Sequence, residues 1–217
     1  MPERPVLYSF RRCPYAMRAR LALAASAQQC VLREIVLRDK PAEMIAASAK
    51  ATVPVLCLPD GHVLEESLDI MMWALGRNDP ERWLTPKTGS LAEMTALIAA
   101  NDGPFKDHLD RYKYAGRYEG SNDAEHHRAE GTRFLCALNA RLEENGQLFG
   151  SRNSLADIAI FPFVRQFANT DRHWFDAQPL KALQRWLDAH LASELFQSVM
   201  CKWPVWVPGD DETLFPA

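Results

Sequence analysis

The segment Cys13-Pro14-Tyr15-Ala16 holds the thiol whose surroundings best suggest reactivity. Proline is favoured at the first position of a helix, so we expect a helix over residues 14–28 with Cys13 as its N-cap, beside unpaired backbone N–H groups. Four arginines lie near it in the sequence: Arg11, Arg12, Arg18 and Arg20. Their charges and the positive end of the helix favour thiolate over thiol, and in such settings a cysteine pKa can fall from about 8.5 to roughly 3.5–7.5. Cys13 is therefore the leading candidate for a nucleophile.

The residue three places after Cys13 limits what this thiol can do. A two-cysteine redox motif has its second thiol there, but this sequence has Ala16. Cys13 therefore cannot close a local disulfide, and its chemistry needs a thiol from another molecule. The alternative interpretation is that Cys13 is an inert helix-start residue, because free cysteines are often simply buried.

The remaining cysteines are scattered and form neither a CxxC pair nor a Cys/His metal pattern. We expect Cys30 to open a strand, Cys57 to lie within a strand and Cys136 to lie on an apolar helix face, all as structural residues. Cys201 is a second candidate for a reactive thiol. The pair His126-His127 has no ligand partner at helical spacing, so we expect solvated surface there and no metal site.

Composition excludes several classes of protein. The chain has 217 residues, 47% of them hydrophobic, and no apolar run approaches the ~20 residues that span a bilayer. A net charge of −3 gives no sign of a nucleic-acid surface. The first residues lack the apolar core of a signal peptide, and the scattered cysteines are typical of a reducing compartment. We therefore expect a cytoplasmic protein that binds neither membranes nor nucleic acids.

Residues 5–78 alternate between strand-like and helix-like segments. Their patterns predict strands at 6–10, 31–37, 53–58 and 62–65, and helices at 14–28, 41–48 and 67–75. Asp60-Gly61 is a strong two-residue turn signal between the last two strands, and Gly76 is expected to end the last helix. The order β-α-β-α-β-β-α implies one parallel strand pair and an antiparallel edge.

Residues 79–89 contain two prolines and little periodicity, which is typical of a linker. Beyond residue 90 the strand signals vanish, and helical periodicity runs through 90–115, 124–145, 154–169 and 179–200. We therefore predict an α/β domain at 1–78, a linker at 79–89 and an all-α domain at 90–217. The tail with Trp203 and Trp206 has no helical pattern and is expected to wrap over the surface.

Ser154 and Asp157 are spaced as a capping box, in which each side chain bonds the backbone N–H of the other residue. An apolar run, Ile158 to Phe161, follows at once and predicts a buried helix. Asp157 could instead be a catalytic acid. We prefer the capping interpretation, because a carboxylate three residues after serine at the start of an apolar helix is usually a cap.

These residues together resemble the glutathione transferase superfamily over nearly the whole chain. Cys13-Pro14-Tyr15-Ala16 is similar to the motif of its cysteine-type classes, notably omega, and of the related glutaredoxin-like proteins. The segment Ser154–Asp157 falls where that superfamily carries its helix-capping box. The resemblance implies a thioredoxin-like first domain, an all-helical second domain, glutathione as co-substrate and a homodimer.

Three further segments resemble the glutathione-binding parts of that superfamily. Leu37–Pro41 is similar to the segment whose lysine, here Lys40, meets the glycine carboxylate of glutathione. Val53-Pro54 is similar to its cis-proline step, whose preceding residue pairs by its backbone with the cysteinyl part. Glu66-Ser67 is similar to the acidic–hydroxyl pair that holds the γ-glutamyl end. The resemblance thus implies these glutathione-binding residues: Tyr15, Leu37, Lys40, Val53, Pro54, Glu66 and Ser67.

Those roles also fit the chemistry of glutathione, which has two carboxylates, one ammonium and a thiol. Lys40 is a cation for one carboxylate. Glu66 can hold the ammonium, while Ser67 and the helix N-terminus behind it can take the other carboxylate. Each residue alone has an ordinary structural interpretation, and it is the set in this order that indicates a glutathione site.

The second substrate is expected to lie between the domains, against the first long helix of the second. Phe105, Leu109 and Tyr112 recur there at helical spacing, beside Lys106 and Lys113. Trp174 follows a predicted helix and could close the same pocket. The alternative is that these apolar residues are core and the lysines face solvent.

The resemblance implies a glutathione-dependent thiol transferase or reductase that acts on a small-molecule or protein disulfide, or on an oxidant such as dehydroascorbate. Cys13 would form a mixed disulfide with glutathione, and a second glutathione would resolve it. One alternative is a conjugating transferase, in which the thiolate of glutathione attacks an electrophile and Tyr8, Ser9 or Tyr15 donates a hydrogen bond. Another is a non-enzymatic interaction protein on the same fold.

Overall fold

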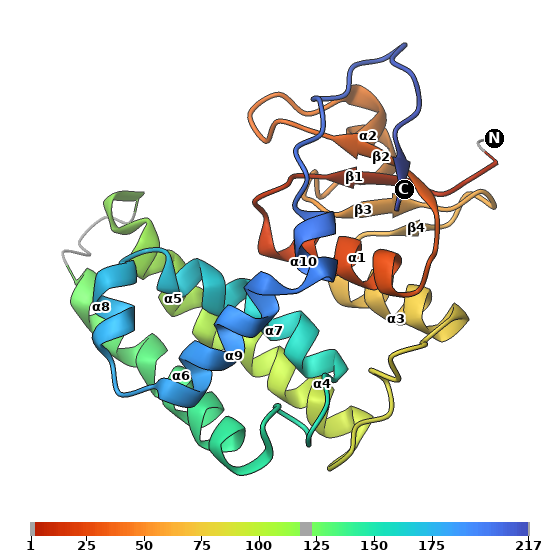
Figure 1. Ribbon diagram of the computed structural model, residues 1–217. Coiled ribbons are helices and arrows are strands. Elements are labelled where there is room, and N and C mark those ends of the chain that lie inside the picture. Colours follow the sequence, from red (N-terminus) through yellow and green to blue (C-terminus); the bar gives the residue numbers. More distant parts are fainter. Residues whose placement is uncertain (1–2, 118–122, 217) are drawn as a thin grey trace. The chain divides into compact units, whose positions relative to one another are not determined.

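The computed structural model describes residues 3–117 and 123–216, and the chain divides into two compact units (Figure 1). The sheet unit comprises the chain up to Glu81 and again from Ser193, and the helical unit is Arg82–Ala192. The sequence-based boundary assigned all residues from 90 on to the second domain. In the structure, the segment from Ser193 on packs with the first unit, because it adds a strand to the sheet.

Within the described residues, the sheet unit is built on a five-stranded sheet of order β4-β3-β1-β2-β5. The strands are β1 Val6–Ser9, β2 Cys30–Glu34, β3 Val55–Cys57, β4 Val63–Leu64 and β5 Leu214–Phe215. β1 and β2 run parallel, while β3, β4 and β5 each pair antiparallel to a neighbour. The predicted parallel pair and antiparallel edge are confirmed.

The helices of this unit cover both faces of the sheet (Figure 1). They are α1 Pro14–Ala25, α2 Ala42–Ala47, α3 Ser67–Arg77 and α10 Glu194–Val199. α1 packs against α3 and α10, whereas Met44 of α2 joins a core cluster with Val6, Tyr8 and Val55 of the sheet. α3 continues through Gly76, where the sequence predicts its end, and reaches Arg77.

Strand β5 is absent from the sequence-based prediction. Leu32 N donates to Thr213 O (2.8 Å) and Trp206 N donates to Glu34 O (2.8 Å), so the C-terminal segment lines the edge of β2. The Arg33 guanidinium carbon lies 4.0 Å from the centre of the Trp206 ring, which anchors this segment on the sheet. β5 escapes prediction because two paired residues leave no alternating pattern to detect.

Over its described residues, 82–117 and 123–192, the helical unit contains helices and two short turns. They are α4 Leu91–Ala100, π-helical turn η1 Asn101–Phe105, α5 Lys106–Lys113, 3₁₀ turn η2 Ala115–Arg117, α6 Ala124–Asn145, α7 Leu155–Ala168, α8 Arg172–Ala177 and α9 Lys181–Ala192. The helix predicted over 90–115 is interrupted at η1, where Pro104 has no N–H to donate. The helix predicted over 179–200 divides into α9 and α10 at Ser193, whose Oγ accepts from Phe196 N (3.2 Å).

The predicted capping box opens α7. Ser154 N donates to Asp157 Oδ2 at 2.8 Å, and both residues are buried, which confirms the capping interpretation. None of the helices in the described ranges is long and apolar enough to cross a membrane.

Candidate thiol site

Cys13 is the N-cap of α1, as the sequence predicts, with Pro14 at the start of the helix. Its backbone is extended (φ −72°, ψ 124°), so the chain enters the helix directly after the thiol. Cys13 N donates to Phe10 O (3.0 Å), and the side chain is half-exposed. The thiol therefore lies at the positive end of α1 and can still be reached by a reactant.

The peptide bond between Val53 and Pro54 is cis, which confirms that part of the resemblance. Cys13 Sγ lies 3.7 Å from Val53 O and donates to it, although the two residues are 40 positions apart. Both Val53 and Pro54 are buried just before β3. The structure thus places Cys13, the predicted nucleophile, next to Val53, the residue predicted to pair by its backbone with a peptide ligand.

Glu66 and Ser67 open α3, with Glu66 as the N-cap and Ser67 as the first helical residue. Glu66 is exposed, and its Oε1 accepts from Lys50 Nζ at 2.6 Å. Ser67 is buried, and its Oγ accepts from Arg18 Nη1 at 3.4 Å. This helix start therefore carries an acidic group that already holds an ammonium, beside a hydroxyl in contact with a guanidinium.

Leu37 and Lys40 lie in the segment between β2 and α2. Val36 and Asp39 form an isolated bridge, and Asp39 N donates to Val36 O (3.0 Å), which places Leu37 in a tight turn. Leu37 is 45% exposed, and Lys40 is half-exposed just after the turn. Both are accessible, but the strand predicted to reach Leu37 ends at Glu34.

The three possible donors for a conjugating mechanism differ in access. Tyr8 is buried in the core, its hydroxyl accepts from Arg33 Nη1 (2.6 Å), and burial raises the pKa of this phenol. Ser9 is fully buried, with its Oγ accepting from Arg20 Nη1 (2.5 Å). Tyr15 is half-exposed, and the Arg18 guanidinium lies 5.4 Å from its ring centre. Of the three, Tyr15 is the one that a ligand can reach.

Sequence reasoning missed several residues of this region. Lys50 carries no local signal, because its partner Glu66 is 16 positions away. Arg20 was considered only as one of four nearby cations, yet it is fully buried and binds the chain just before Cys13. The sequence pattern predicts Glu34 only as part of a strand, although a carboxylate at the end of an apolar strand is a detectable signal of a buried charge.

The residues predicted for a second-substrate pocket lie in different settings within the helical unit. Phe105 and Leu109 are buried at 2% and 0% exposure, so the alternative reading of them as core residues holds. Tyr112 and Trp174 meet around Arg128, whose guanidinium carbon is 6.0 Å from the Tyr112 ring centre and 4.7 Å from that of Trp174. Tyr112 is buried as well, whereas Trp174 is half-exposed, so of the four Trp174 is the one that a ligand can reach.

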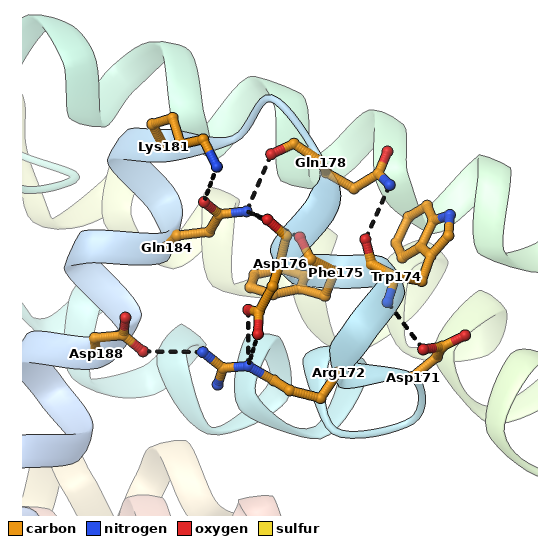
Figure 2. A network of polar contacts seen from close by, with 9 residues as sticks. All are labelled: Asp171, Arg172, Trp174, Phe175, Asp176, Gln178, Lys181, Gln184 and Asp188. Atoms are coloured by element: carbon orange, nitrogen blue, oxygen red, sulfur yellow. Dashed lines mark hydrogen bonds and ion pairs between the residues drawn. The ribbon is translucent and has the colours of Figure 1, made fainter.

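Trp174 is held by a short helix with many polar contacts, as Figure 2 shows. Asp171 caps α8 by accepting from Trp174 N (2.9 Å), and Gln178 Nε2 donates to Trp174 O (2.9 Å). Gln184 of α9 donates to Phe175 O, Asp176 O and Gln178 O at the other end of the helix. These contacts fix the backbone that carries the indole.

The other cysteines and the histidine pair complete the list of reactive side chains. Cys30 is buried at the start of β2, and burial raises the pKa of its thiol to about 12. Cys136 is exposed on α6, so its predicted place on an apolar face is wrong, and Cys201 is exposed as well. His127 does have a partner, because its Nδ1 lies 2.9 Å from His108 Nδ1. Within the described residues, no group of three or more possible ligands is placed to hold a metal ion.

Comparison with known families assigns both units of this fold. Residues 7–83 match the glutathione S-transferase N-terminal domain, and residues 106–189 match the glutathione S-transferase C-terminal domain. A thioredoxin-like sheet unit with a cis-proline step beside an N-cap cysteine, followed by helices, agrees with that match. The chain belongs to the glutathione transferase superfamily.

Solved structures with the same fold include proteins crystallised with glutathione. A glutathione S-transferase from Methylobacillus flagellatus with glutathione bound is 23% identical, with a TM-score of 0.78 over 90% of this chain and 98% of the other. One from Pseudomonas putida with glutathione disulfide bound is 21% identical, with a TM-score of 0.78 over 92% and 91%. Glutathione transferase Omega 3C from Trametes versicolor is 19% identical, with a TM-score of 0.75 over 90% and 84%. No curated protein sequence matched this chain.

Proposed function

We propose that the protein is a glutathione-dependent thiol transferase in which Cys13 forms a mixed disulfide with glutathione. The observation that carries this proposal is the position of Cys13 Sγ, at the start of α1 and 3.7 Å from the carbonyl of the residue before the cis-proline. A peptide that paired with the Val53 backbone would place its own sulfur close to this thiol.

The residues around the thiol suit glutathione. Glu66 already holds the ammonium of Lys50, so the γ-glutamyl ammonium could take the same place. Ser67 at the start of α3, with Arg18 against it, could receive the neighbouring carboxylate. Lys40 is exposed enough to meet the glycine carboxylate.

The reaction follows from a single thiol whose motif has no second thiol. The Cys13 thiolate attacks the glutathione sulfur of a mixed disulfide, which forms a disulfide between Cys13 and glutathione and releases the other half as a thiolate. The thiolate of a second glutathione then attacks the same sulfur, which releases glutathione disulfide and restores the Cys13 thiolate. Over the two steps, one mixed disulfide and one glutathione thiol give glutathione disulfide and one free substrate thiol, so the second glutathione is the reductant. Ala16 leaves the intermediate open to this outside attack.

Reduction of a small glutathionyl mixed disulfide by wild type and by Cys13→Ala tests the proposal. We expect the variant to lose at least about a thousandfold in rate, because the nucleophile is gone. Cys201→Ser is the matched control, since it removes an exposed thiol of the same unit and should leave the rate unchanged. Equal rates for wild type and Cys13→Ala would contradict the assignment.

A conjugating transferase is the weaker candidate, because Tyr8 and Ser9 are buried and hydrogen-bonded within the protein. Intact-protein mass after exposure to glutathione disulfide distinguishes the two. One adduct that requires Cys13 supports thiol transfer, and no adduct together with conjugation of an electrophile supports the alternative. The homodimer and the cytoplasmic location stay predictions.

A further inference from the structure

The Arg20 side chain is fully buried in α1 and binds the loop that leads to Cys13. Its Nη1 donates to Ser9 Oγ (2.5 Å), and its Nη2 donates to Arg11 O (2.7 Å). Its Nε donates to Val199 O of α10 (3.0 Å), which adds a third anchor for the guanidinium. Because Cys13 N itself donates to Phe10 O, Arg20 holds the backbone on which the thiol depends.

Glu34, the last residue of β2, binds the same loop from the sheet. It is 7% exposed, and its Oε1 accepts from Arg11 N at 2.7 Å. Within the described chain, its Oε2 has no hydrogen-bond partner. Burial raises the pKa of this carboxyl, while the Arg11 backbone N–H and the charges of Arg20 and Arg11 lower it.

Two buried groups of opposite charge therefore hold one residue: Arg20 binds the carbonyl of Arg11, and Glu34 binds its N–H. Charges in a buried setting act over several ångströms with little screening by water. Burial lowers the pKa of Arg20 to about 10, whereas the charges of Glu34 and of the Cys13 sulfur raise it and that of Arg11 lowers it. Arg20 thus interacts electrostatically with both Glu34 and Cys13, and Glu34 is hydrogen-bonded to Arg11 N, two residues before the thiol.

The remaining charges near the thiol are placed differently. Arg12 is exposed, with its guanidinium 5.5 Å from the centre of the Phe10 ring. Arg11 is half-exposed, and Arg18 is buried against Ser67. Two groups at the C-terminal end of α10 meet Arg20, Val199 O and the Sδ atom of the following Met200, and both are uncharged.

We propose that Arg20 and Glu34 act in opposite directions on the Cys13 sulfur, with Arg20 favouring the thiolate and Glu34 opposing it. This inference rests on the proposed role of Cys13 as the nucleophile. The opposed pair keeps the thiolate from being over-stabilised. Thiol exchange is fastest when the attacking thiol ionises near ambient pH, so such a balance suits a transferase.

The rate of alkylation of Cys13 by iodoacetamide, followed against pH, tests the proposal in full-length protein whose exposed thiols, Cys136 and Cys201, are replaced by serine. The adduct is measured on the peptide that contains Cys13, because Cys57 is half-exposed as well. Glu34→Gln keeps an oxygen that can accept from Arg11 N and removes the negative charge. The midpoint of the curve of alkylation rate against pH should therefore fall by on the order of one pH unit. Arg20→Met should raise it by a similar amount. A variant that merely loosened the loop would not produce shifts of opposite sign.

Arg12→Gln is the matched control, because it removes a charge next to Cys13 that water already screens. Its midpoint should move by no more than a few tenths of a unit. Shifts of the same sign in Glu34→Gln and Arg20→Met, or an equal shift in Arg12→Gln, would overturn the inference. If Arg20→Met does not fold, the Glu34→Gln variant tests the inference by itself. A midpoint of alkylation that does not fall in Glu34→Gln would then overturn the inference. A wild-type midpoint equal to that of free cysteine would instead overturn the proposed function.

Discussion

Each unit of the molecule buries a carboxylate, and the two carboxylates differ in how many hydrogen bonds they accept. Asp157 of the helical unit accepts from Leu148 N (2.9 Å) and Trp186 Nε1 (3.0 Å) at Oδ1, and from Ser154 N (2.8 Å) and Ser154 Oγ (2.6 Å) at Oδ2. Glu34 of the sheet unit accepts from one backbone N–H, and its other oxygen has no hydrogen-bond partner among the described residues.

The difference separates a structural charge from one that is available to act on a neighbour. Asp157 joins α7 and α9 to the turn before them, and every one of its hydrogen bonds serves the fold. Glu34 is hydrogen-bonded to the loop of the candidate nucleophile and interacts electrostatically with the buried Arg20, and our proposal assigns its charge a role on the thiol. Counting the donors on a buried carboxylate therefore helps to tell which role it has.

Replacing each carboxylate by its isosteric amide gives the largest effect that this comparison predicts. Asp157→Asn should lower the free energy of unfolding by about 2–4 kcal/mol, because one acceptor becomes an NH₂ group that faces two donors. Glu34→Gln should change it by less than about 1 kcal/mol, since the amide oxygen still accepts from Arg11 N. Urea unfolding of both variants measures the difference.

Asp171→Ala serves as a control for the loss of a cap alone. Asp171 is exposed and accepts from one backbone N–H, so its removal should cost about 1 kcal/mol. If Glu34→Gln proves as destabilising as Asp157→Asn, the distinction between the two carboxylates is wrong.

His190 extends the comparison to a buried base. It stacks on Phe161 with ring centres 4.6 Å apart, and burial lowers its pKa to about 4 from the ordinary 6.5. Its neutral form is therefore favoured in the folded state, so stability is fully present above about pH 6.5 and is lost as the pH falls towards 4.

The loss between those two pH values should amount to about 3 kcal/mol for this residue. His190→Phe keeps the ring and removes the titration, so its free energy of unfolding should fall less between pH 7 and pH 4 than that of wild type. His62→Gln, at an exposed position of the sheet unit, should leave the pH dependence unchanged. Urea unfolding across this pH range that gave parallel curves for wild type and His190→Phe would contradict the assignment.

The smallest predicted effect compares one glycine in a helix of each unit. A Cβ on Gly131 of α6 would lie 2.6 Å from Cε2 of Phe167, so Gly131→Ala should destabilise by about 1–2 kcal/mol despite the better helix propensity of alanine. A Cβ on Gly76 of α3 meets nothing within 4 Å, so Gly76→Ala should stabilise by up to about 1 kcal/mol. Thermal unfolding measures both variants. If Gly131→Ala and Gly76→Ala change the stability in the same direction, the space around the added Cβ does not determine the sign of the effect.

Features encoded by neighbouring residues could be predicted from the sequence. The N-cap at Cys13, the capping box at Ser154 and the strand–helix order of the first eighty residues each depend on local patterns, and the structure confirms them. The interruption at η1 was missed, because the spacing of the apolar residues does not show where a proline forces a π turn. β5 is too short to carry a pattern.

The candidate site was predictable only where the resemblance supplied the long-range relation. It related the Val53-Pro54 step to the cysteinyl part of glutathione and Cys13 to the glutathione sulfur, and the structure brings Val53 O to 3.7 Å from Cys13 Sγ. Partners such as Lys50 with Glu66, or Arg20 with Val199, are 16 and 179 residues apart, and no periodicity in the sequence relates them. Their pairing is decided by tertiary packing.

The return of the last segment to β2 has a consequence for synthesis. On the ribosome, the whole helical unit emerges before Leu214 and Phe215 can complete the sheet, so the outer edge of β2 remains unpaired while it is made. An open strand edge invites association with other nascent chains. Truncation just before residue 201 should therefore lower the yield of unaggregated protein even where the helical unit folds normally.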